Sequence, residues 1–487
     1  MEINMLSRSF RVHFVGIGGI GMSGIAEVLL VQGWPVSGSD LRSSPITERL
    51  QGLGARIHIG HAAANLGDAE VVVISSAVSP DNPEVAAARA QQLPVIPRAE
   101  MLAELMRLKF GIAVAGMHGK TTTTSMIAAV LAGVGLDPTV VVGGRVDAIG
   151  SNARLGSSDY LVAEADESDR SFLALAPIIA VITNLDREHL DCYRDLEDIQ
   201  SAFVSFANRV PFYGTVVACA DDAATRAILP HIRRRTLTYG LHEESDLQVL
   251  HPEMAGMEAR FHLRPTSAAA HLLGRGQEAS RDLGEFWLPR PGMHNVLDAS
   301  AAIAVGLLLR GELELIRTAI AGFSGVDRRF QFRGEVRGVQ VVDDYGHHPT
   351  ELAATLAAAR EVVHAAAGGD GRVLMIFQPH RYTRTFHLQA EFAQVLTLAD
   401  QTWLLDIYPA GETPIPGISA AALAARAHTA GARVSYAASP GQAIAAAAAA
   451  ARPGDLILTQ GAGSVSSLGA KLLAALQATP QPLASQP

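Results

Sequence analysis

Short apolar runs recur along the chain, and many of them end at a glycine or at a cluster of polar residues. The run at 111–115 reads GIAVA and stops at Gly116. Beyond Gly119 the apolar positions take the spacing of one helical face, formed by Met126, Ile127, Val130 and Leu131. This pattern predicts a buried strand, a glycine-rich turn and then a helix.

The start of the chain has the same pattern. An apolar run at 11–15 is followed by GIGGIG and by a helical pattern through Leu30. Further apolar runs at 34–38 and 71–74 predict two more strands. Because strands that alternate with helices form parallel sheets, we predict a Rossmann-like α/β domain over residues 1–106.

Two further α/β regions follow. We predict a P-loop ATPase-like α/β domain over 107–324, although 213–286 carries few motifs, and a second Rossmann-like α/β domain over 325–487. The polar tail after about Gln477 is expected to be disordered. Each predicted strand of the last domain precedes a polar cluster, and these strands are 339–342, 372–377, 402–405 and 456–459.

Composition and charge narrow the class of protein. A chain of 487 residues holds about three domains of ~150 residues. The net charge of −9 argues against nucleic acid or an anionic membrane as a partner. Two cysteines are too few for a disulfide framework, and no apolar segment suggests a signal peptide or a membrane span. We therefore expect a cytoplasmic enzyme, as a monomer or a weak homodimer.

The turn after the run at 111–115 has the composition of a phosphate-binding loop. Backbone N–H groups at a helix start attract phosphate, Lys120 can reach the terminal phosphates of ATP, and Thr121 offers a hydroxyl to Mg²⁺. The usual spacing, G-x-x-x-x-G-K-[ST], has its first glycine where this chain has Val114, so the turn is a compact variant; a turn that binds nothing is the alternative. The predicted ATP-binding residues here are Gly116, Met117, His118, Gly119, Lys120, Thr121 and Thr122.

Two strand ends in the middle domain add metal-binding chemistry. The strand predicted at 160–163 ends at Glu164, and an acid beside a phosphate loop supplies the oxygen ligands that Mg²⁺ prefers. A solvated acidic loop is the alternative. His189 follows the strand predicted at 178–183; a single histidine is usually structural, but this position favours a role at a second Mg²⁺ or at the acceptor. The predicted metal residues are Thr121, Glu164 and His189.

The first glycine-rich turn is typical of nucleotide binding. It reads G-x-G-x-x-G between a strand and a helix, and Asp40 lies ~20 residues further on, where a carboxylate often meets a ribose. A nucleotide-diphosphate substrate, NAD(P) and a fold without a ligand all remain possible, because fold does not fix function. The candidate residues are Gly16, Gly18, Gly19, Gly21, Ser39, Asp40 and Ser75.

The last domain places its polar clusters where open α/β sheets bind ligands, at the carboxyl ends of the strands. The clusters read DDYGHHP, QPHRYTR, DIYPAGE and QGAGS, and their arginines and histidines favour an anionic ligand. Zinc is a weaker alternative, because no third ligand lies at metal spacing. Before this domain, Asn295 opens a helix predicted from residue 296, which it could cap; contact with adenine is the alternative.

The chain resembles the Mur ligases of peptidoglycan synthesis over nearly its whole length. The matching segments are HFVGIGGIGMSGIAEVL, SGSD, GMHGKTTTT, EADESD, HNVLDA, DDYGHHPTE, QPHRYTRT and DIYPAGE. The resemblance implies that ATP phosphorylates the lactyl carboxylate of UDP-N-acetylmuramate. The amine of L-alanine then attacks the acyl phosphate, which gives an amide, ADP and phosphate.

The resemblance also implies roles for individual residues. Lys120 would stabilise the β- and γ-phosphates, Thr121 and Glu164 would hold one Mg²⁺, and His189 would help to hold a second. Asn295 would meet adenine, Arg329 the γ-phosphate and Asp344 the ribose of ATP. The first glycine-rich turn would hold the UDP diphosphate. The muramoyl carboxylate, the transferred phosphate and alanine would be gathered by His347, Arg381 and Arg384.

Three other functions remain as alternatives. A recycling ligase would join a murein tripeptide, instead of alanine, to the same sugar nucleotide. An NAD-dependent oxidoreductase would use the first glycine-rich turn but would leave Lys120 and Glu164 without a role. A regulator would bind ATP without turning it over.

Overall fold

The structure is a computed structural model that describes residues 10–75, 77–146, 151–190, 192–274, 282–365 and 369–478. Apart from Ala478, the tail predicted to be disordered lies outside the described residues. The chain forms two compact units, which we describe separately. The first comprises 1–250, 262–286 and 297–324, and the second comprises 251–261, 287–296 and 325–487.

The first sheet is parallel throughout, as the alternating pattern predicts. Its strands, in order across the sheet, are β3 (Arg56–Ile59), β2 (Val36–Asp40), β1 (Val12–Val15), β4 (Val71–Ile74) and β5 (Val95–Pro97). Its helices are α1 (Ile20–Val31), α2 (Pro45–Gly52), η2 (Ala63–Leu66), α3 (Pro83–Ala90) and α4 (Arg98–Arg107).

The second strand differs from its prediction by two residues at each end. Pro35 has no N–H to give to a neighbouring strand, which suits a position just before β2. The strand then continues through Ser39 and Asp40, and Asp40 pairs with Ile59. These two polar residues therefore belong to the strand end and not to the loop that follows.

The middle sheet has ten strands, and a strand with a phosphate-loop pattern lies near its centre. In order across the sheet they are β15 (Glu285–Leu288), β14 (Glu258–Pro265), β13 (Leu247–Ala255), β12 (Thr236–Gly240), β11 (Thr215–Cys219), β10 (Ile179–Ile182), β6 (Phe110–Ala115), β9 (Tyr160–Glu164), β7 (Thr139–Val146) and β8 (Ser151–Arg154). The helices that accompany them are α5 (Lys120–Gly133), η4 (Ser171–Ala174), α6 (Leu196–Ala207), α7 (Ala223–Ile228), η5 (Leu229–His231), α8 (Ser267–Leu272), α9 (Met293–Leu308) and α10 (Leu313–Ala321).

The strand β6 has β10 on one side and β9 on the other, both parallel to it. The carboxyl ends of all three strands therefore meet at one edge of the sheet, beside the start of α5. The predicted apolar face of α5 is buried, with Met126, Ile127, Val130 and Leu131 all at 0% exposure. Burial of this face fixes the start of the helix against the sheet.

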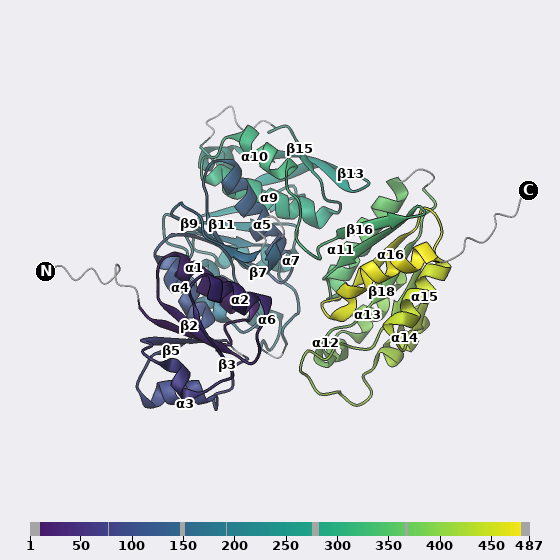
Figure 1. The fold of residues 1–487 in the computed structure, drawn as a ribbon. Helices are drawn as coiled ribbons and strands as arrows, with labels where there is room; N and C mark the ends of the chain where they lie inside the picture. Colours follow the sequence, from purple (N-terminus) through teal and green to yellow (C-terminus); the bar gives the residue numbers. More distant parts are fainter. Residues whose placement is uncertain are drawn as a thin grey trace, which may run out of the picture. The chain divides into compact units, whose positions relative to one another are not determined.

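The last sheet has six strands and is covered on both faces. In order they are β16 (Gln331–Val336), β17 (Val339–Asp344), β21 (Leu456–Gln460), β18 (Val373–Phe377), β19 (Gln401–Leu404) and β20 (Val434–Tyr436). Its helices are α11 (Pro349–Ala365), α12 (Tyr382–His387), α13 (Gln389–Val395), η7 (Leu396–Leu398), α14 (Ala420–Thr429), α15 (Pro440–Ala450), η8 (Ser464–Ser467) and α16 (Leu468–Ala478). Figure 1 shows α16, in yellow, beside the green strands of this sheet.

Alternation along β18 explains the two layers of helices. Met375 and Phe377 point into one apolar cluster, which includes residues of α11, α13 and α14. Leu374 and Ile376 belong to a second cluster, which includes residues of α15 and α16. Successive strand residues face opposite sides, so a wholly apolar strand needs cover on both.

The described helices contain no segment that is both long and apolar enough to cross a membrane.

Candidate active site

The turn between β6 and α5 can be built only with glycine at two positions. Gly119, at φ 81°, caps the helix in the left-handed region, and a side chain there would meet Asp298 Oδ1 at 2.7 Å. Gly116 has φ 141°, and a Cβ at this position would overlap Thr183 Oγ1. The turn therefore packs closely against its neighbours, and its backbone leads directly into the N-terminus of α5, the end of a helix that favours an anion.

Lys120 folds back over this turn. Its Nζ donates hydrogen bonds to Gly116 O at 2.7 Å, to Met117 O at 3.1 Å and to Glu167 Oε1 at 2.8 Å. Burial would lower the pKa of Lys120, but the carboxylates of Glu167 and Glu164 outweigh that effect and raise it. The side chain is thus a fixed cation in the predicted phosphate-binding turn.

Thr121 and Glu164, which were predicted to share a metal ion, lie in direct contact at this sheet edge. Thr121 Oγ1 donates to Glu164 Oε2 at 3.0 Å, and Glu164 is the last residue of β9, which pairs with β6. A hydroxyl and a carboxylate oxygen beside a phosphate-binding turn are the donors that Mg²⁺ prefers. These two residues therefore fit the metal proposed for them.

His189 lies close to this group. Its Nε2 is 3.4 Å from Glu167 Oε1, and its backbone has φ 52°, in the left-handed region that few residues other than glycine adopt. Glu167 is buried at 1% exposure, and its backbone oxygen accepts a hydrogen bond from Tyr193 OH at 2.7 Å. The structure therefore brings Lys120, Glu164, Glu167 and His189 to one edge of the middle sheet.

The loop after β10 holds the turn between β6 and α5 from the other side. Asn184 Oδ1 accepts from His118 N at 2.9 Å, and its Nδ2 donates to His118 O at 3.0 Å. His118 Nε2 lies 3.0 Å from Asp186 Oδ2, so the imidazole is engaged by that loop. Met117 is buried at 4% exposure, which leaves its backbone as the part that can meet a phosphate.

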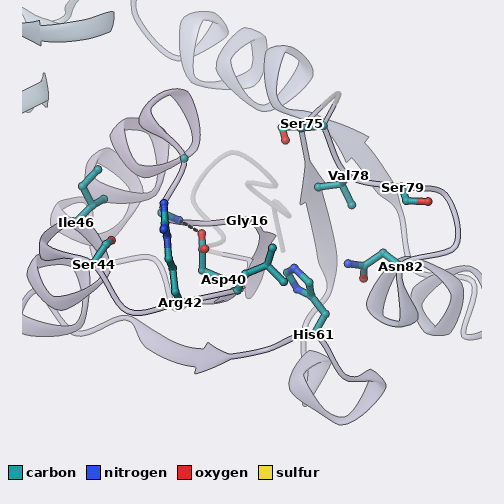
Figure 2. A pocket seen from close by; sticks show the side chains of 14 residues that line it. Gly16, Asp40, Arg42, Ser44, Ile46, His61, Ser75, Val78, Ser79 and Asn82 are labelled. Carbon is teal, nitrogen blue, oxygen red and sulfur yellow. Dashed lines mark hydrogen bonds between the residues drawn. The ribbon is translucent and has the colours of Figure 1, made fainter. Parts of the chain in front are cut away.

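The first domain contains a pocket of about 670 Å³ at the glycine-rich turn (Figure 2). Five of the predicted residues line it: Gly16, Gly18, Gly19, Asp40 and Ser75. Figure 2 shows Ser44 and Ile46 on one wall, and Ser75, Val78, Ser79 and Asn82 on the opposite wall. Its volume is that of a cavity for a small ligand.

Two predicted residues of this turn have other surroundings. A side chain on Gly21 would meet Arg98 Nη1 at 2.8 Å, so this glycine makes room for an arginine. Ser39 is buried, and its hydroxyl donates to Glu84 Oε2 at 2.5 Å. Neither lines the described pocket.

Asp40 closes the glycine turn of this pocket. Its Oδ2 accepts from Gly18 N at 2.9 Å, the hydrogen bond drawn in Figure 2. Arg42 and His61 also line the pocket, and neither was predicted. Both follow the carboxyl end of a strand, β2 or β3, so the strand-end argument used for the last domain would have identified them.

A buried carboxylate lies behind the pocket. Glu84 is wholly buried, accepts from Asn65 Nδ2 at 2.6 Å, and lies 3.6 Å from His13 Nε2 and 3.4 Å from His61 Nδ1. Burial would raise the pKa of Glu84, but the adjacent His13 ring and the hydrogen bonds from Ser39 and Asn65 lower it to about 2. This charged network fixes the direction of His61.

In the second unit, four neighbouring parallel strands bring the predicted polar clusters to one edge of the sheet. The ring of His347 lies 5.4 Å from that of His380, which stacks on Tyr408 at 5.5 Å. Arg384 Nη1 is 3.4 Å from His380 Nδ1. Burial and the charge of Arg384 lower the pKa of His380 to about 4, so this imidazole is neutral at pH 7.

Arg381 and Arg329 are each paired with a carboxylate. Arg381, at φ 71°, lies 3.2 Å from Glu412 through its Nε. Arg329 Nη1 lies 3.3 Å from Glu351 Oε1. Both guanidinium groups are thereby oriented within this edge, where they add positive charge for an anion.

Asp344 and Asn295 are more constrained than the sequence suggests. Asp344 accepts from Phe330 N, Gly346 N and Gln460 Nε2 at 2.9, 2.8 and 2.7 Å. Asn295 lies inside the first turn of α9, which begins at Met293 and not at the predicted residue 296, so it does not precede the helix as a cap. Its Nδ2 donates to Pro291 O at 2.7 Å. Contact of either residue with ATP remains a prediction.

Three family models match the chain, and together they cover most of it. Residues 11–110 match "Mur ligase family, catalytic domain", residues 114–306 match "Mur ligase middle domain", and residues 328–463 match "Mur ligase, glutamate ligase domain".

Individual relatives are similar over nearly the full chain. A UDP-N-acetylmuramate–L-alanine ligase from Koribacter versatilis is 57% identical over 97% of this chain and 99% of its own length. One from Solibacter usitatus is 55% identical over 97% of each. The crystal structure of UDP-N-acetylmuramate-alanine ligase from Thermotoga maritima matches with TM-score 0.75 and 28% identity, over 96% of this chain and 99% of that one. A murein peptide ligase from Psychrobacter arcticus matches with TM-score 0.67 and 25% identity, over 97% and 100%.

Proposed function

This chain belongs to the Mur ligase family, and on that premise we propose that it joins L-alanine to the lactyl carboxylate of UDP-N-acetylmuramate at the expense of ATP. The observation that carries the proposal is the 57% identity to an L-alanine ligase over 97% of the chain. The product is UDP-N-acetylmuramoyl-L-alanine, a precursor in peptidoglycan synthesis, with ADP and phosphate.

The reaction has two steps. A carboxylate oxygen of the lactyl group attacks the γ-phosphorus of ATP, the bond to the β–γ bridging oxygen breaks, and ADP leaves. The amine of alanine then attacks the acyl carbon, the tetrahedral intermediate expels phosphate, and the nitrogen loses a proton. The first step brings a carboxylate against a polyphosphate, so it depends on positioning and on fixed positive charge.

Lys120 supplies such a charge. Its ammonium is held at the phosphate-binding turn, within reach of the β- and γ-phosphates of a nucleotide whose phosphates occupy that turn. His347, Arg381 and Arg384 would receive the substrate carboxylate, the transferred phosphate and alanine at their own sheet edge. The neutral imidazole of His380 beside them leaves the arginines as the cations there.

Mg²⁺ is the cofactor that the donor set fits best. Thr121 and Glu164 would hold one ion and His189 would help to hold a second, and the ions would neutralise phosphate and carboxylate charge. We expect chelation by EDTA to abolish ADP release and added Mg²⁺ to restore it. Full turnover in the presence of EDTA would contradict the metal assignment.

The pocket at the first glycine-rich turn would hold the UDP part of the sugar nucleotide. It combines backbone N–H groups for the diphosphate with Arg42 and His61 as donors, and apolar walls for the base. Bound NAD in the purified protein would instead favour an oxidoreductase, which leaves the whole Lys120 site without a role.

The acceptor decides between the two ligases. We would incubate the protein with ATP and UDP-N-acetylmuramate, add either L-alanine or the murein tripeptide, and detect products by mass. We expect the product of L-alanine. Product from the tripeptide alone would establish the recycling ligase, and ATP binding without ADP release would favour the regulator.

We also propose that the enzyme works in the cytoplasm as a monomer or a weak homodimer, where its three small-molecule substrates are available. Sedimentation of the purified protein across a range of concentrations measures the second point. A tetramer at all concentrations would contradict it.

A further inference from the structure

A carboxylate without a role in the reaction described above lies between two of its proposed residues. Glu167 is 1% exposed, and one of its oxygens serves both neighbours. Oε1 accepts a hydrogen bond from Lys120 Nζ at 2.8 Å and lies 3.4 Å from His189 Nε2. Oε2 is buried and has no hydrogen-bond partner among the described residues.

All three hydrogens of the Lys120 ammonium are in use. A lysine ammonium has three donors, and here they go to Gly116 O, Met117 O and Glu167 Oε1. For Lys120 to donate to a triphosphate, at least one of these bonds must be exchanged. The two carbonyls belong to the turn that would cradle the phosphates, whereas Glu167 is an anion that an arriving triphosphate repels. The bond to Glu167 is therefore the one to exchange.

The exchange has a consequence for His189. Once Lys120 turns to the phosphate, the neighbour left beside Glu167 Oε1 is His189 Nε2, at 3.4 Å. The backbone of His189 is fixed at φ 52°, so its side chain leaves the loop in a restricted direction. A carboxylate that accepts from one ring nitrogen orients an imidazole and presents its other nitrogen to a ligand.

We propose that Glu167 is a positioning residue that holds Lys120 until ATP arrives and then orients His189. Arrival of the triphosphate would thereby have two effects: Lys120 turns to the phosphates, and Glu167 becomes available to orient His189. The inference rests on the proposed function, because it requires ATP to occupy the Lys120 turn. Glu167 itself touches no reacting atom.

The test is Glu167→Gln, which keeps the size of the side chain and an oxygen for Lys120 but removes the charge. We expect kcat to fall about 100-fold, the cost of misplacing groups by about 1 Å. We expect KM for ATP to fall about threefold, since no anion competes for Lys120 or repels the phosphates. A non-hydrolysable ATP analogue should bind more tightly by a similar factor in calorimetry.

Asp169→Asn is the matched control. Asp169 is an exposed acid of the same loop that accepts from Ser171 N at 2.9 Å, so the variant makes the same charge change away from Lys120. We expect wild-type kcat and KM. Glu167→Asp keeps the charge but withdraws it from both neighbours, and should lower kcat about tenfold with KM for ATP unchanged.

The outcomes distinguish a failure of the role given to Glu167 from a failure of the proposed function. Wild-type kcat in Glu167→Gln, or a raised KM for ATP with unchanged kcat, would overturn the role of Glu167. If Glu167→Gln does not fold, wild-type kcat in Glu167→Asp would overturn it. A wild-type enzyme that makes no amide product with ATP would instead contradict the proposed function, whatever the variants do.

Discussion

The molecule contains two glycine-rich turns built on the same plan but with different chemistry. Each turn follows a central parallel strand, β1 or β6, and leads into a helix, α1 or α5. The first turn lies on a pocket of about 670 Å³, and Asp40 accepts a hydrogen bond from its Gly18 N. The second carries Lys120, held by Glu167 and close to Glu164.

The comparison shows that the same strand–turn–helix arrangement does not determine which charged groups a site contains. Strand, glycine turn and helix give both sites backbone N–H groups and a helix start, which suit phosphate. Only the second turn adds a fixed ammonium and carboxylates that can hold a cation, and phosphoryl transfer needs both. Damage to the first turn should therefore appear mainly in substrate binding, and damage to the second mainly in turnover.

The largest effect is expected from Lys120→Ala. Loss of the ammonium should lower kcat about 1000-fold, in line with the loss of one fixed donor to a charged transition state. ADP release measures it, and the circular dichroism spectrum should stay that of the wild type. Because the substitution removes the lysine partner of the buried Glu167, Lys120→Ala combined with Glu167→Gln is the companion variant. Unchanged turnover in either variant would refute the role of Lys120.

The next effect concerns Glu84, which supports the first turn through Ser39 and His61. The folded protein holds its pKa near 2, against an ordinary value of 4.5, so the ionised form stabilises the fold above about pH 4.5. That contribution, about 3 kcal/mol, is lost as the pH falls from about 5 to 2. In Glu84→Gln, the urea midpoint of unfolding should fall less steeply than in the wild type as the pH is lowered over this range. The exposed Glu48→Gln variant should keep the wild-type slope, and an equal slope in all three proteins would contradict the assignment.

Gly18→Ala tests the first turn directly. The added Cβ would lie 2.9 Å from Asp40 Oδ2 and 3.0 Å from Thr47 Cγ2, so the Asp40 carboxylate that accepts from Gly18 N, or the turn itself, must shift. We expect KM for UDP-N-acetylmuramate to rise about tenfold while kcat and KM for ATP change less than about twofold. Gly52→Ala, where the added atom meets nothing within 4 Å, is the control. A fall in kcat at unchanged KM would contradict the assignment of substrate binding to the first turn and of turnover to the second.

The smallest effect concerns the ion pair between the first domain and the acidic loop of the middle domain. Arg98 Nη2 lies 3.0 Å from Asp166 Oδ2, with side chains 21% and 41% exposed. Solvent screens such a pair, and a double-mutant cycle with Arg98→Met and Asp166→Asn should give a coupling below about 1 kcal/mol in urea unfolding. A coupling of about 3 kcal/mol or more would mean that the pair is shielded from solvent and couples the stability of the first domain to that of the acidic loop.

The local parts of both sites could be predicted from sequence, because they depend on short spacings. The strand at Val71–Ile74 has the predicted bounds, and α5 begins at Lys120, just after the predicted turn. Thr121 and Glu164, which were predicted to hold one Mg²⁺, lie within hydrogen-bond distance because β6 leads into α5 and β9 lies beside β6. The parallel pairing of the central strands follows from the same alternation of strands and helices, whereas β8 and β16 at the edges pair antiparallel.

Partners far apart in sequence could not be predicted. The strand β21 inserts between β17 and β18, which only long-range pairing decides. The edge strand β16 was missed because its residues are polar and its register breaks between Phe332 and Gly334. In the sequence, Glu167 is one of four acidic residues in the segment EADESD at 164–169. Only its contact with Lys120 in the structure distinguishes it from the others.

One measurement tests the central claim most directly, which is that ATP is used to phosphorylate the lactyl carboxylate. UDP-N-acetylmuramate labelled with oxygen-18 in that carboxylate would be turned over with ATP and L-alanine, and the released phosphate analysed by mass. The account predicts that each phosphate carries one labelled oxygen from the substrate. Phosphate without label, released in step with amide product, would contradict it.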